Sequence, residues 1–170
     1  MIAPNRLPVI QLCTIKLPAV NPGYAGVMNA LLLENQVCFA VHAASRALDG
    51  FYRRQLAELG LTYPQYLVML VLWEREPVTV KELGVALRLD SGTLSPLLKR
   101  LEAAGLVRRE RNASDERSVV VRLTEAGTEL RQSALRVPEH VANATGMHLS
   151  ELADLHRTLG RMTQALTEAT

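Results

Sequence analysis

The sequence between residues 79 and 124 constrains the fold more strongly than any other part of the chain. Thr79 precedes a short amphipathic segment, and this order predicts an N-cap followed by a helix over residues 80–87. Asp90 or Ser91 is expected to cap a second helix only a few residues later. Two short helices separated by so tight a turn predict a helix-turn-helix unit.

The second of these helices is predicted to have two faces of different chemistry. Its apolar side chains recur at positions i, i+3, i+4 and i+7, which predicts that they face the core. They are Leu94, Leu97, Leu98 and Leu101. The polar side chains left facing outward are Thr93, Ser95, Lys99 and Arg100. The helix is expected to end near Ala104, where Gly105 can adopt the left-handed conformation that closes a helix.

A basic hairpin is predicted immediately after this helix. Residues 107–111 and 118–123 have strand-like patterns, and residues 112–116 are rich in turn formers. The arginines of this segment are Arg108, Arg109, Arg111, Arg117 and Arg122. The planar guanidinium of Arg117 suits a narrow, electronegative minor groove, with Asp115 holding it extended. The alternative is a local pair between Asp115 and Arg117 that only stiffens the turn.

A helix-turn-helix followed by a basic ribbon is the order of a winged helix-turn-helix, which predicts binding to double-stranded DNA. The candidate DNA-contacting residues are Ser91, Thr93, Ser95, Lys99, Arg100, Arg109, Asp115 and Arg117. The hydroxyls are expected to meet base edges or phosphates, and the cations phosphates or guanine acceptors. Residues 77–123 carry nine Lys and Arg against six Asp and Glu, an excess of +3, although the whole chain carries only +2. An ordinary solvated helix face is the alternative.

The segment before this unit is predicted to be helical. Apolar residues recur at near-helical spacing over residues 31–59, and a kink or break is expected at Asp49 and Gly50, which are poor helix formers. A further helix is expected from a Thr62 cap to about Glu76. Its predicted apolar stripe consists of Leu67, Leu70, Val71 and Trp73.

Two more helices are predicted after the hairpin. They cover about residues 125–136 and 150–166, with Pro138 and Gly146 marking the break between them. The apolar residues of these helices are Leu130, Leu152, Leu155, Leu159, Met162 and Leu166. A small DNA-binding module does not need all of them for its own core. We therefore expect them to pair with a second subunit, which would hold two modules at a fixed spacing on a palindromic operator.

These elements predict one mainly α-helical domain with a small β-wing over residues 28–170. The expected boundaries are about 31–59 and 125–168 for the dimerisation helices and about 62–124 for the winged helix. Residues 1–27 contain four prolines and no periodic pattern, which is typical of a loose tail. Because Met28 lies immediately before the first periodic segment, we hypothesise that the tail is an upstream misassignment of the start.

Composition limits the classes that remain. Cys13 and Cys38 match neither a zinc-ligand spacing nor a CxxC pair, so no metal, cofactor or disulfide framework is expected. The longest apolar runs fall short of the roughly 20 residues that a membrane span needs, and no charged-then-apolar leader is found. We therefore expect a cytoplasmic protein that does not contact membranes.

Cys38 is the candidate for a reactive group. It lies near the start of the first long helix, where the helix partial charge favours the thiolate that peroxides attack. Tyr52, Tyr63 and Tyr66 are potential hydrogen-bond donors to that thiolate, and His42 lies on the same helical face. The alternative is that Cys38 is a small buried apolar residue. Chemistry alone leaves both interpretations open.

Motifs over residues 31 to about 166 resemble the MarR family of dimeric winged-helix regulators, and in particular its organic hydroperoxide resistance branch. They are LENQVCF (33–39), LTYPQY (61–66), LDSGTLSPLLKRLEAAGLV (89–107) and DERSV (115–119). The resemblance implies that organic hydroperoxide oxidises Cys38 to a sulfenic acid and so lifts repression. It also implies that Tyr52 and Tyr63 of the partner subunit hold the thiolate, and that Asp115 and Arg117 form a wing-tip pair.

Two features depart from the pattern of that branch. Some members have a second cysteine in the C-terminal helices that forms an intersubunit disulfide, whereas no cysteine follows Cys38 here. The resemblance therefore implies the one-cysteine route, in which a low-molecular-weight thiol caps the sulfenic acid or further oxidation follows. His42 stands where relatives commonly have tyrosine.

Two other functions are compatible with the sequence. One is a regulator that responds to a phenolic or other small ligand bound between the dimerisation helices and the DNA-binding module, with Cys38 only filling space. The other is a thiol-dependent peroxidase, which is disfavoured because Arg46 is the only arginine near Cys38 and no core cysteine is available to resolve it. We expect a regulator and not an enzyme.

Overall fold

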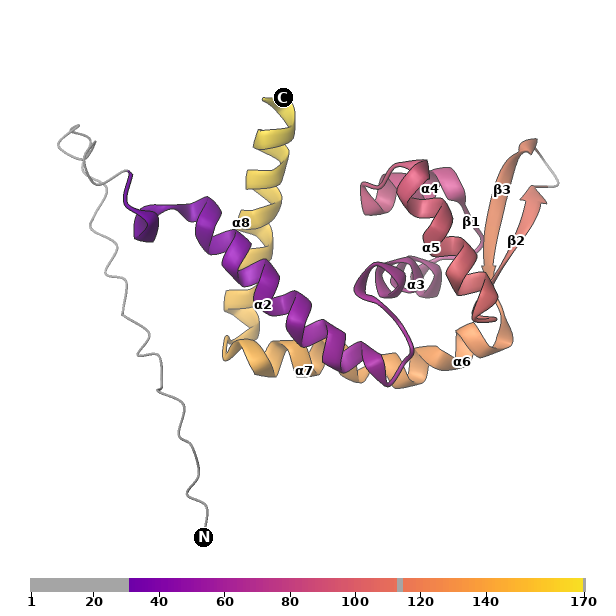
Figure 1. The fold of residues 1–170 in the computed structure, drawn as a ribbon, viewed down its shortest axis with the longest axis horizontal. Coiled ribbons are helices and arrows are strands. Elements are labelled where there is room, and N and C mark those ends of the chain that lie inside the picture. Colours follow the sequence, from indigo (N-terminus) through magenta and orange to yellow (C-terminus); the bar gives the residue numbers. More distant parts are fainter. Residues whose placement is uncertain (1–30, 113–114, 170) are drawn as a thin grey trace, which may run out of the picture. The chain divides into compact units, whose positions relative to one another are not determined.

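The structure is a computed structural model that describes residues 31–112 and 115–169, with the side chains of residues 112–117 outside the described part. The chain divides into two compact units, Met1–Val41 and His42–Thr170. The elements in chain order (Figure 1) are η1 (Leu33–Asn35), α2 (Val37–Ala57), α3 (Tyr63–Glu74), β1 (Val78–Thr79), α4 (Val80–Leu87), α5 (Ser91–Ala103), β2 (Val107–Asn112), β3 (Asp115–Leu123), α6 (Glu125–Ala134), α7 (Arg136–Thr145) and α8 (Leu149–Glu168). Among the described residues, none of these helices combines the length and apolarity that crossing a bilayer would require.

The predicted fold class is confirmed, since the protein is mainly helical with a small antiparallel sheet. The sheet has three strands in the order β1-β3-β2. The third strand, β1, was not predicted, because two residues are too few to produce an alternating pattern. It pairs Val78 with Val121 and Thr79 with Val120. The hairpin strands are also longer than expected, since β2 reaches Asn112 and β3 begins at Asp115, over residues predicted to form the turn.

Helix α3 lies at the centre of the winged helix and contacts α4, α5, α6 and β3. Its N-cap at Thr62 is as predicted, and the side chain of Gln65 accepts hydrogen bonds from the Thr62 backbone and hydroxyl, each at 2.9 Å. The predicted apolar stripe is right only in part, since Val71 and Trp73 pack partly buried against the core. The residues that α3 buries are Gln65, Tyr66, Val68, Met69 and Leu72, whereas Leu70 of the predicted stripe is exposed. Helix α3 is apolar almost all round, so residue spacing gives no indication of which face turns inward.

Helix α2 differs from its prediction at its start and in its middle. It begins at Val37 after a 3-10 turn, and it runs unbroken through Asp49 and Gly50. The predicted break is therefore absent. A glycine within a helix costs only about 1 kcal/mol relative to alanine, which the rest of a 21-residue helix can offset.

The C-terminal region holds three helices where two were predicted. Pro138 was expected to interrupt the chain, but it lies in the first turn of α7, where a helix tolerates proline. Gly146 ends α7 with a φ of 66°, as its predicted role as a breaker requires. Helix α7 also contacts α2, because the Nδ1 atom of His140 lies 2.7 Å from Oε1 of Gln55.

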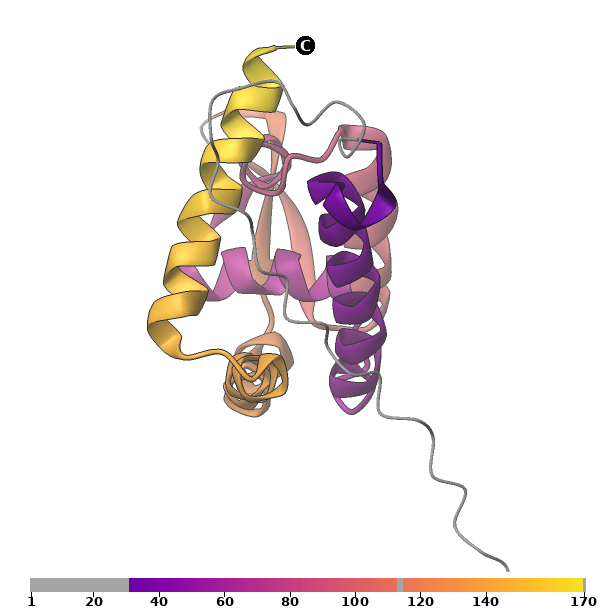
Figure 2. The same cartoon turned by 90° about the vertical axis from the view of Figure 1, so that its left-hand side faces the viewer.

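Helix α8 turns away from the end of α7 (Figure 2) and buries none of its residues within the described chain. Its exposed leucines are Leu149, Leu155, Leu159 and Leu166. These residues include part of the apolar stripe from which a second subunit was expected. These four leucines thus lack cover from their own chain, whereas Leu152 and Met162 are partly buried, and the homodimer itself stays a prediction.

Candidate nucleic-acid interface and thiol site

Helix α5 is capped by the carboxylate of Asp90, one of the two residues predicted for this role. Its Oδ1 accepts the Thr93 backbone N–H and its Oδ2 accepts the Thr93 hydroxyl, each at 2.9 Å. The hydrogen bond from the Thr93 backbone N–H, and after it the one from the Thr93 hydroxyl, holds the pKa of the Asp90 carboxyl below its usual value. The helix closes at Gly105, whose φ of 71° confirms the predicted left-handed position.

The leucine face of α5 is buried as predicted, with exposed fractions of 1% for Leu94, 8% for Leu97, 1% for Leu98 and 0% for Leu101. The opposite face carries the predicted polar residues. They are Ser91, Thr93, Ser95, Lys99 and Arg100, and all are exposed. The orientation of α5 that buries its four leucines therefore also exposes these polar side chains to solvent.

The hydroxyls on this face already donate their protons within the helix. Thr93 donates to Asp90, and the Ser95 hydroxyl donates to the Ser91 carbonyl at 2.7 Å. A hydroxyl has one proton but two lone pairs, so Thr93 and Ser95 remain able to accept. In the major groove, the donors that they could meet are the amino groups of adenine and cytosine.

The cations of α5 differ from those of the wing in how they are paired. Among the residues that the structure describes, neither Lys99 nor Arg100 forms an ion pair. Arg109 was predicted to contact DNA, but its Nε and Nη2 lie 2.9 and 2.6 Å from Oε2 of Glu102 on α5. The Arg109 backbone N–H also donates to Glu102 Oε1 at 3.1 Å. Arg109 thus joins β2 to α5, and its contact with DNA stays a prediction.

Glu102 was not among the predicted site residues. Its bond to the Arg109 guanidinium lowers the pKa of the Glu102 carboxyl, so this pair remains charged near neutral pH. A carboxylate on α5, the second helix of the helix-turn-helix and its recognition helix, gives no recognisable sequence pattern with an arginine seven residues later on β2. Only the hairpin's return toward α5 brings the two side chains together.

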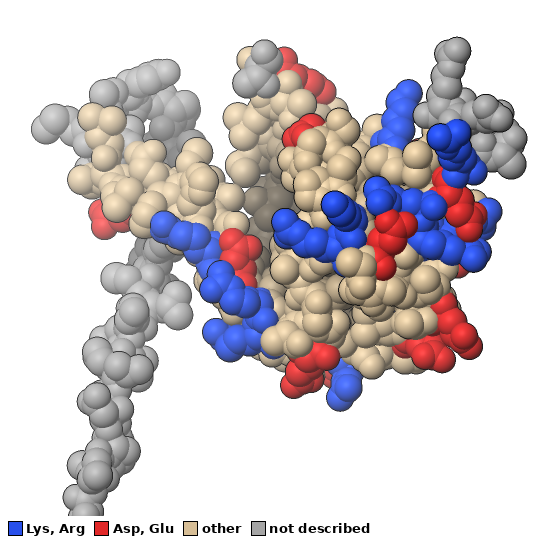
Figure 3. Space-filling model, turned by 45° about the vertical axis from the view of Figure 1, so that its right-hand side comes forward, with Lys and Arg blue, Asp and Glu red and all other residues tan. Residues whose placement is uncertain are grey.

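A second carboxylate, Glu110, lies between two arginines near the base of the wing. It lies 3.0 Å from the Nε of Arg108 and 3.3 Å from the Nε of Arg122, two arginines that face each other across the strands. Without the carboxylate, the two cations would repel. Figure 3 shows Lys and Arg side chains gathered over this face, with Asp and Glu set among them.

Arg88 is a candidate that the sequence did not single out. It ends α4 in the left-handed conformation, with φ 54° and ψ 42°, and its side chain is exposed between the two helices of the helix-turn-helix. A residue with a side chain pays a steric cost there that glycine avoids. Non-glycine residues held in this region often mark functional sites.

The backbones of Asp115 and Arg117 belong to β3, so the pair lies in a strand and not in the predicted turn. Their side chains lie outside the described part of the structure. The wing-tip pairing of Asp115 with Arg117 therefore stays a prediction.

Three tyrosines predicted for the thiol site do come together. The ring centroids of Tyr52 and Tyr63 lie 4.4 Å apart, and those of Tyr52 and Tyr66 lie 6.2 Å apart. Burial, reinforced by Tyr63 and then Tyr66, raises the pKa of Tyr52 to about 12. Burial also raises the pKa of Tyr63, with a further contribution from Asp49, and that of Tyr66. All three phenols are therefore protonated donors at neutral pH.

Cys38 lies in the first turn of α2, is exposed and forms no disulfide. The alternative that Cys38 is a small buried apolar residue therefore finds no support within a single chain. His42 is also exposed on α2. Cys13 lies outside the described residues. Within the described ranges, no group of three or more His, Cys, Asp or Glu residues is placed to hold a metal ion.

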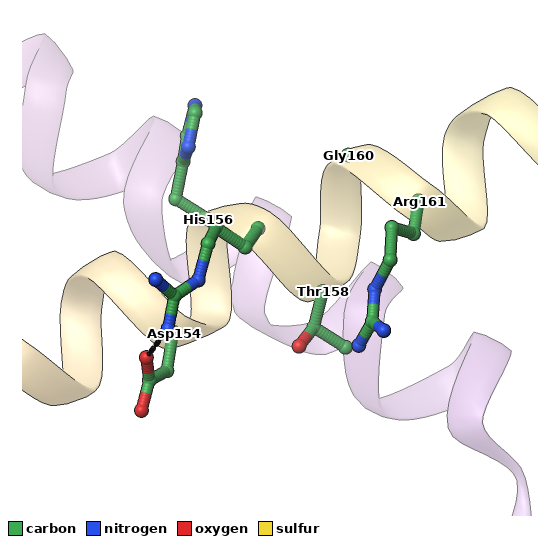
Figure 4. Close-up of a pocket in the computed structure, with 6 residues that line it drawn as sticks. Asp154, His156, Thr158, Gly160 and Arg161 are labelled. Carbon is green, nitrogen blue, oxygen red and sulfur yellow. Dashed lines mark hydrogen bonds and ion pairs between the residues drawn. The ribbon is translucent and has the colours of Figure 1, made fainter.

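Two of the hollows in the described part of the structure differ in their suitability for a ligand. An apolar groove of about 300 Å³ runs between α3 and the α6–α7 junction, and its lining residues include Tyr66, Leu70, Trp73, Arg131, Leu135 and Pro138. The other hollow lies along α8 (Figure 4), where Asp154, Thr158 and Arg161 project from one helix without converging on a common point. Only the groove has the apolar lining that is typical of small-molecule sites.

Fold and site together define a winged helix-turn-helix protein, and comparison with known proteins agrees. The family model described as transcriptional regulator SarA/Rot matches residues 51–133. The chain is 52% identical over 134 residues to the HTH-type transcriptional regulator TtmR of Methylorubrum extorquens, covering 79% of this chain and 69% of that one. It is 44% identical to the organic hydroperoxide resistance transcriptional regulator of Bacillus subtilis, covering 79% and 91%.

A solved structure of AbfR from Staphylococcus epidermidis is similar to this fold, with a TM-score of 0.70 and 36% identity, covering 85% of this chain and 99% of that one. AbfR has also been solved bound to DNA in its reduced form. The chain belongs to the MarR family of winged-helix transcriptional regulators. The relatives named above are regulators and not enzymes.

Proposed function

We propose that this regulator is a repressor that binds a palindromic DNA operator as a homodimer and releases it when an organic hydroperoxide oxidises Cys38. The observation that carries the proposal is an exposed thiol in the first turn of a helix, in a chain that also holds a cluster of protonated tyrosines. The similarity to a named organic hydroperoxide resistance regulator supports the same chemistry.

DNA binding follows from the surface of α5 and the wing. Helix α5 would enter the major groove with Thr93 and Ser95 as acceptors and with Lys99 and Arg100 toward phosphates or guanine. The wing would lie over the neighbouring backbone and minor groove. Reduced AbfR, whose fold is similar, has been solved bound to DNA, which supports DNA binding by this chain.

The oxidation step is a two-electron transfer at sulfur. The Cys38 thiolate attacks a peroxide oxygen, so that an S–O bond forms, the O–O bond breaks and the alkoxide leaves with a proton as an alcohol. The sulfur becomes a sulfenic acid and the hydroperoxide is reduced. A low-molecular-weight thiol then condenses with the sulfenic acid, forming a mixed disulfide and releasing water.

Release of DNA would follow from the change at this one sulfur. In the reduced dimer, the phenol hydroxyls of Tyr52 and Tyr63 of the partner subunit donate to the thiolate. An added oxygen or a bulky thiol displaces these hydroxyls and shifts the two modules away from operator spacing. Loss of spacing lowers affinity because both half-sites must be occupied together.

The test uses a duplex selected from a random library by the reduced protein, with binding followed by fluorescence anisotropy. Cumene hydroperoxide should release the wild-type protein from this duplex, and Cys38→Ser should bind and remain bound. Cys38→Ser is a conservative variant at an exposed position, so its folding should be intact. Release of Cys38→Ser at the same peroxide concentration would contradict the proposal.

A second candidate function rests on the groove between α3 and the α6–α7 junction. Its volume of about 300 Å³ and its apolar lining suit a small phenolic ligand, with Arg131 at hand for an anionic group. A ligand-responsive repressor would release DNA in the presence of salicylate whether or not Cys38 is present. Retention of DNA by both wild type and Cys38→Ser at millimolar salicylate would remove this alternative.

A further inference from the structure

The single tryptophan of the chain makes a hydrogen bond that crosses the winged helix. The indole Nε1 of Trp73 on α3 donates to the backbone carbonyl of Gly127 on α6 at 2.8 Å. The two residues are 54 positions apart, and the bond is partly buried. A partly buried indole N–H needs a hydrogen-bond acceptor. Because the acceptor here is a backbone carbonyl of α6, the bond also holds the first turn of α6 in position against α3.

Gly127 lies close against the backbone of the turn that follows α5. A Cβ atom at this position would lie 2.0 Å from the carbonyl oxygen of Leu106, so only glycine fits against that backbone. Thr124 makes two more contacts with the same turn, because its N–H donates to the Leu106 carbonyl at 3.1 Å and its hydroxyl donates to the Gly105 carbonyl at 2.6 Å. We call these contacts of Thr124 and Gly127 with Gly105 and Leu106 the Gly127 joint. The start of α6 is thereby fastened to the turn that ends α5 and begins β2.

On its other side, Trp73 touches the tyrosine cluster. The ring centroids of Trp73 and Tyr66 lie 6.3 Å apart in an edge-to-face arrangement, and Tyr66 lies 6.2 Å from Tyr52. The ring centroids of Tyr52 and Tyr63 lie 4.4 Å apart, with the ring planes tilted by 38°. Four aromatic rings thus form one continuous row that begins at the phenols of the proposed thiol site and ends at the Gly127 joint.

We propose that Trp73 is a positioning residue that couples the tyrosine cluster to the recognition helix through its hydrogen bond to Gly127. This inference rests on the proposed redox function. Displacement of the Tyr52 ring tilts the ring of Tyr66 and then that of Trp73. The hydrogen bond from the indole N–H then pulls the Gly127 carbonyl with it. Because Gly127 is in tight contact with Leu106, the displacement passes to the end of α5 and the base of the wing.

Trp73→Phe tests this coupling, because it keeps a ring beside Tyr66 and removes the N–H. The variant should bind the selected duplex in its reduced form within about twofold of wild type, and Cys38 should react with cumene hydroperoxide at the wild-type rate. The ratio of oxidised to reduced Kd should fall by about two- to thirtyfold, the range found for residues that carry coupling. A ratio equal to that of wild type would overturn the proposal.

Thr128→Val is the matched control. It removes a hydrogen bond at the start of the same helix, from the Thr128 hydroxyl to the Thr124 carbonyl at 3.0 Å, without touching α3. Its Kd ratio should equal that of wild type, and an equal fall in both variants would overturn the specific role of Trp73. If wild type itself fails to release DNA when oxidised, the redox function fails and not the coupling.

The wild-type protein supplies a second measurement that does not depend on the folding of a variant. Because Trp73 is the only tryptophan, its fluorescence reports on this one site. Oxidation of Cys38 should change the emission of wild type and leave that of Cys38→Ser unchanged. Unchanged emission in a wild-type sample that has released its DNA would contradict the coupling while leaving the redox function intact.

Discussion

Helices α5 and α8 carry similar apolar stripes in sequence but use them differently. The leucines of α5 are between 0% and 8% exposed, whereas Leu149, Leu155, Leu159 and Leu166 of α8 are between 36% and 80% exposed. Helix α5 completes its packing within one chain, and its outer face is free for another molecule. Helix α8 has an apolar face that its own chain does not cover. One region is therefore complete in the monomer, and the other leaves leucines exposed that the proposed second subunit would cover.

The largest effect should come from a cavity beneath α5. Leu98→Ala removes a side chain that is 1% exposed, and this should lower the free energy of unfolding by about 2–5 kcal/mol. Urea unfolding followed by circular dichroism measures the change. Leu166→Ala, at 59% exposure, is the control and should cost much less within a single chain. Equal losses would show that the contrast between the two helices is wrong.

The next effect concerns the partner of α8. Replacing both Leu155 and Leu159 with Glu places two charges on the uncovered stripe, and the dimer dissociation constant should rise at least thirtyfold, corresponding to about 2 kcal/mol at an interface centre. Analytical ultracentrifugation measures it. Helical content should be retained. A dimer as stable as that of wild type would place the subunit interface elsewhere.

The caps and ends of α4 and α5 were predictable because their signals are local. Thr79, Asp90 and Gly105 each act within three residues of their own position, and the leucine period fixes the buried face of α5. The exposure of the polar face of α5 follows directly from that period. The tyrosine cluster was expected only as a set of residue types, and the structure adds its distances.

Features that depend on distant segments were not predictable. Strand β1 exists only because β3 lies beside it, and the Glu102–Arg109 pair forms only when the hairpin returns to α5. The face of α3 is chosen by its neighbours, because the helix is apolar all round. The Gly127 joint gives no signal in sequence beyond a glycine near a helix start. In each case, tertiary contacts decide between local alternatives.

A smaller effect is expected at the turn of the helix-turn-helix. Arg88→Gly relieves the left-handed strain, so the free energy of unfolding should stay the same or rise by up to about 1 kcal/mol. If the exposed guanidinium meets a phosphate, the slope of log Kd against log salt should fall by about 1. Anisotropy titrations at several salt concentrations measure the slope. An unchanged slope would remove Arg88 from the interface.

The smallest effect should appear at high pH. The pKa of Tyr52 is raised to about 12 in the folded protein, above the usual value of 10, so folding favours its protonated form. The stability from this group is fully present below pH 10 and is lost as the pH rises toward 12. Denaturant midpoints across this range should fall more steeply for wild type than for Tyr52→Phe. Parallel curves would show that burial of the Tyr52 phenol does not cause the loss of stability at high pH.

The central claim is that oxidation of one sulfur governs DNA binding, and it is tested most directly by measuring both quantities in the same sample. Reduced protein on its selected duplex is titrated with cumene hydroperoxide, and each sample is split into two halves. Fluorescence anisotropy of one half gives the fraction of DNA released, and the intact mass of the other gives the fraction of Cys38 that is modified. The account predicts that the released fraction rises with the fraction of Cys38 that is modified. Release of DNA while Cys38 is still a thiol would contradict it.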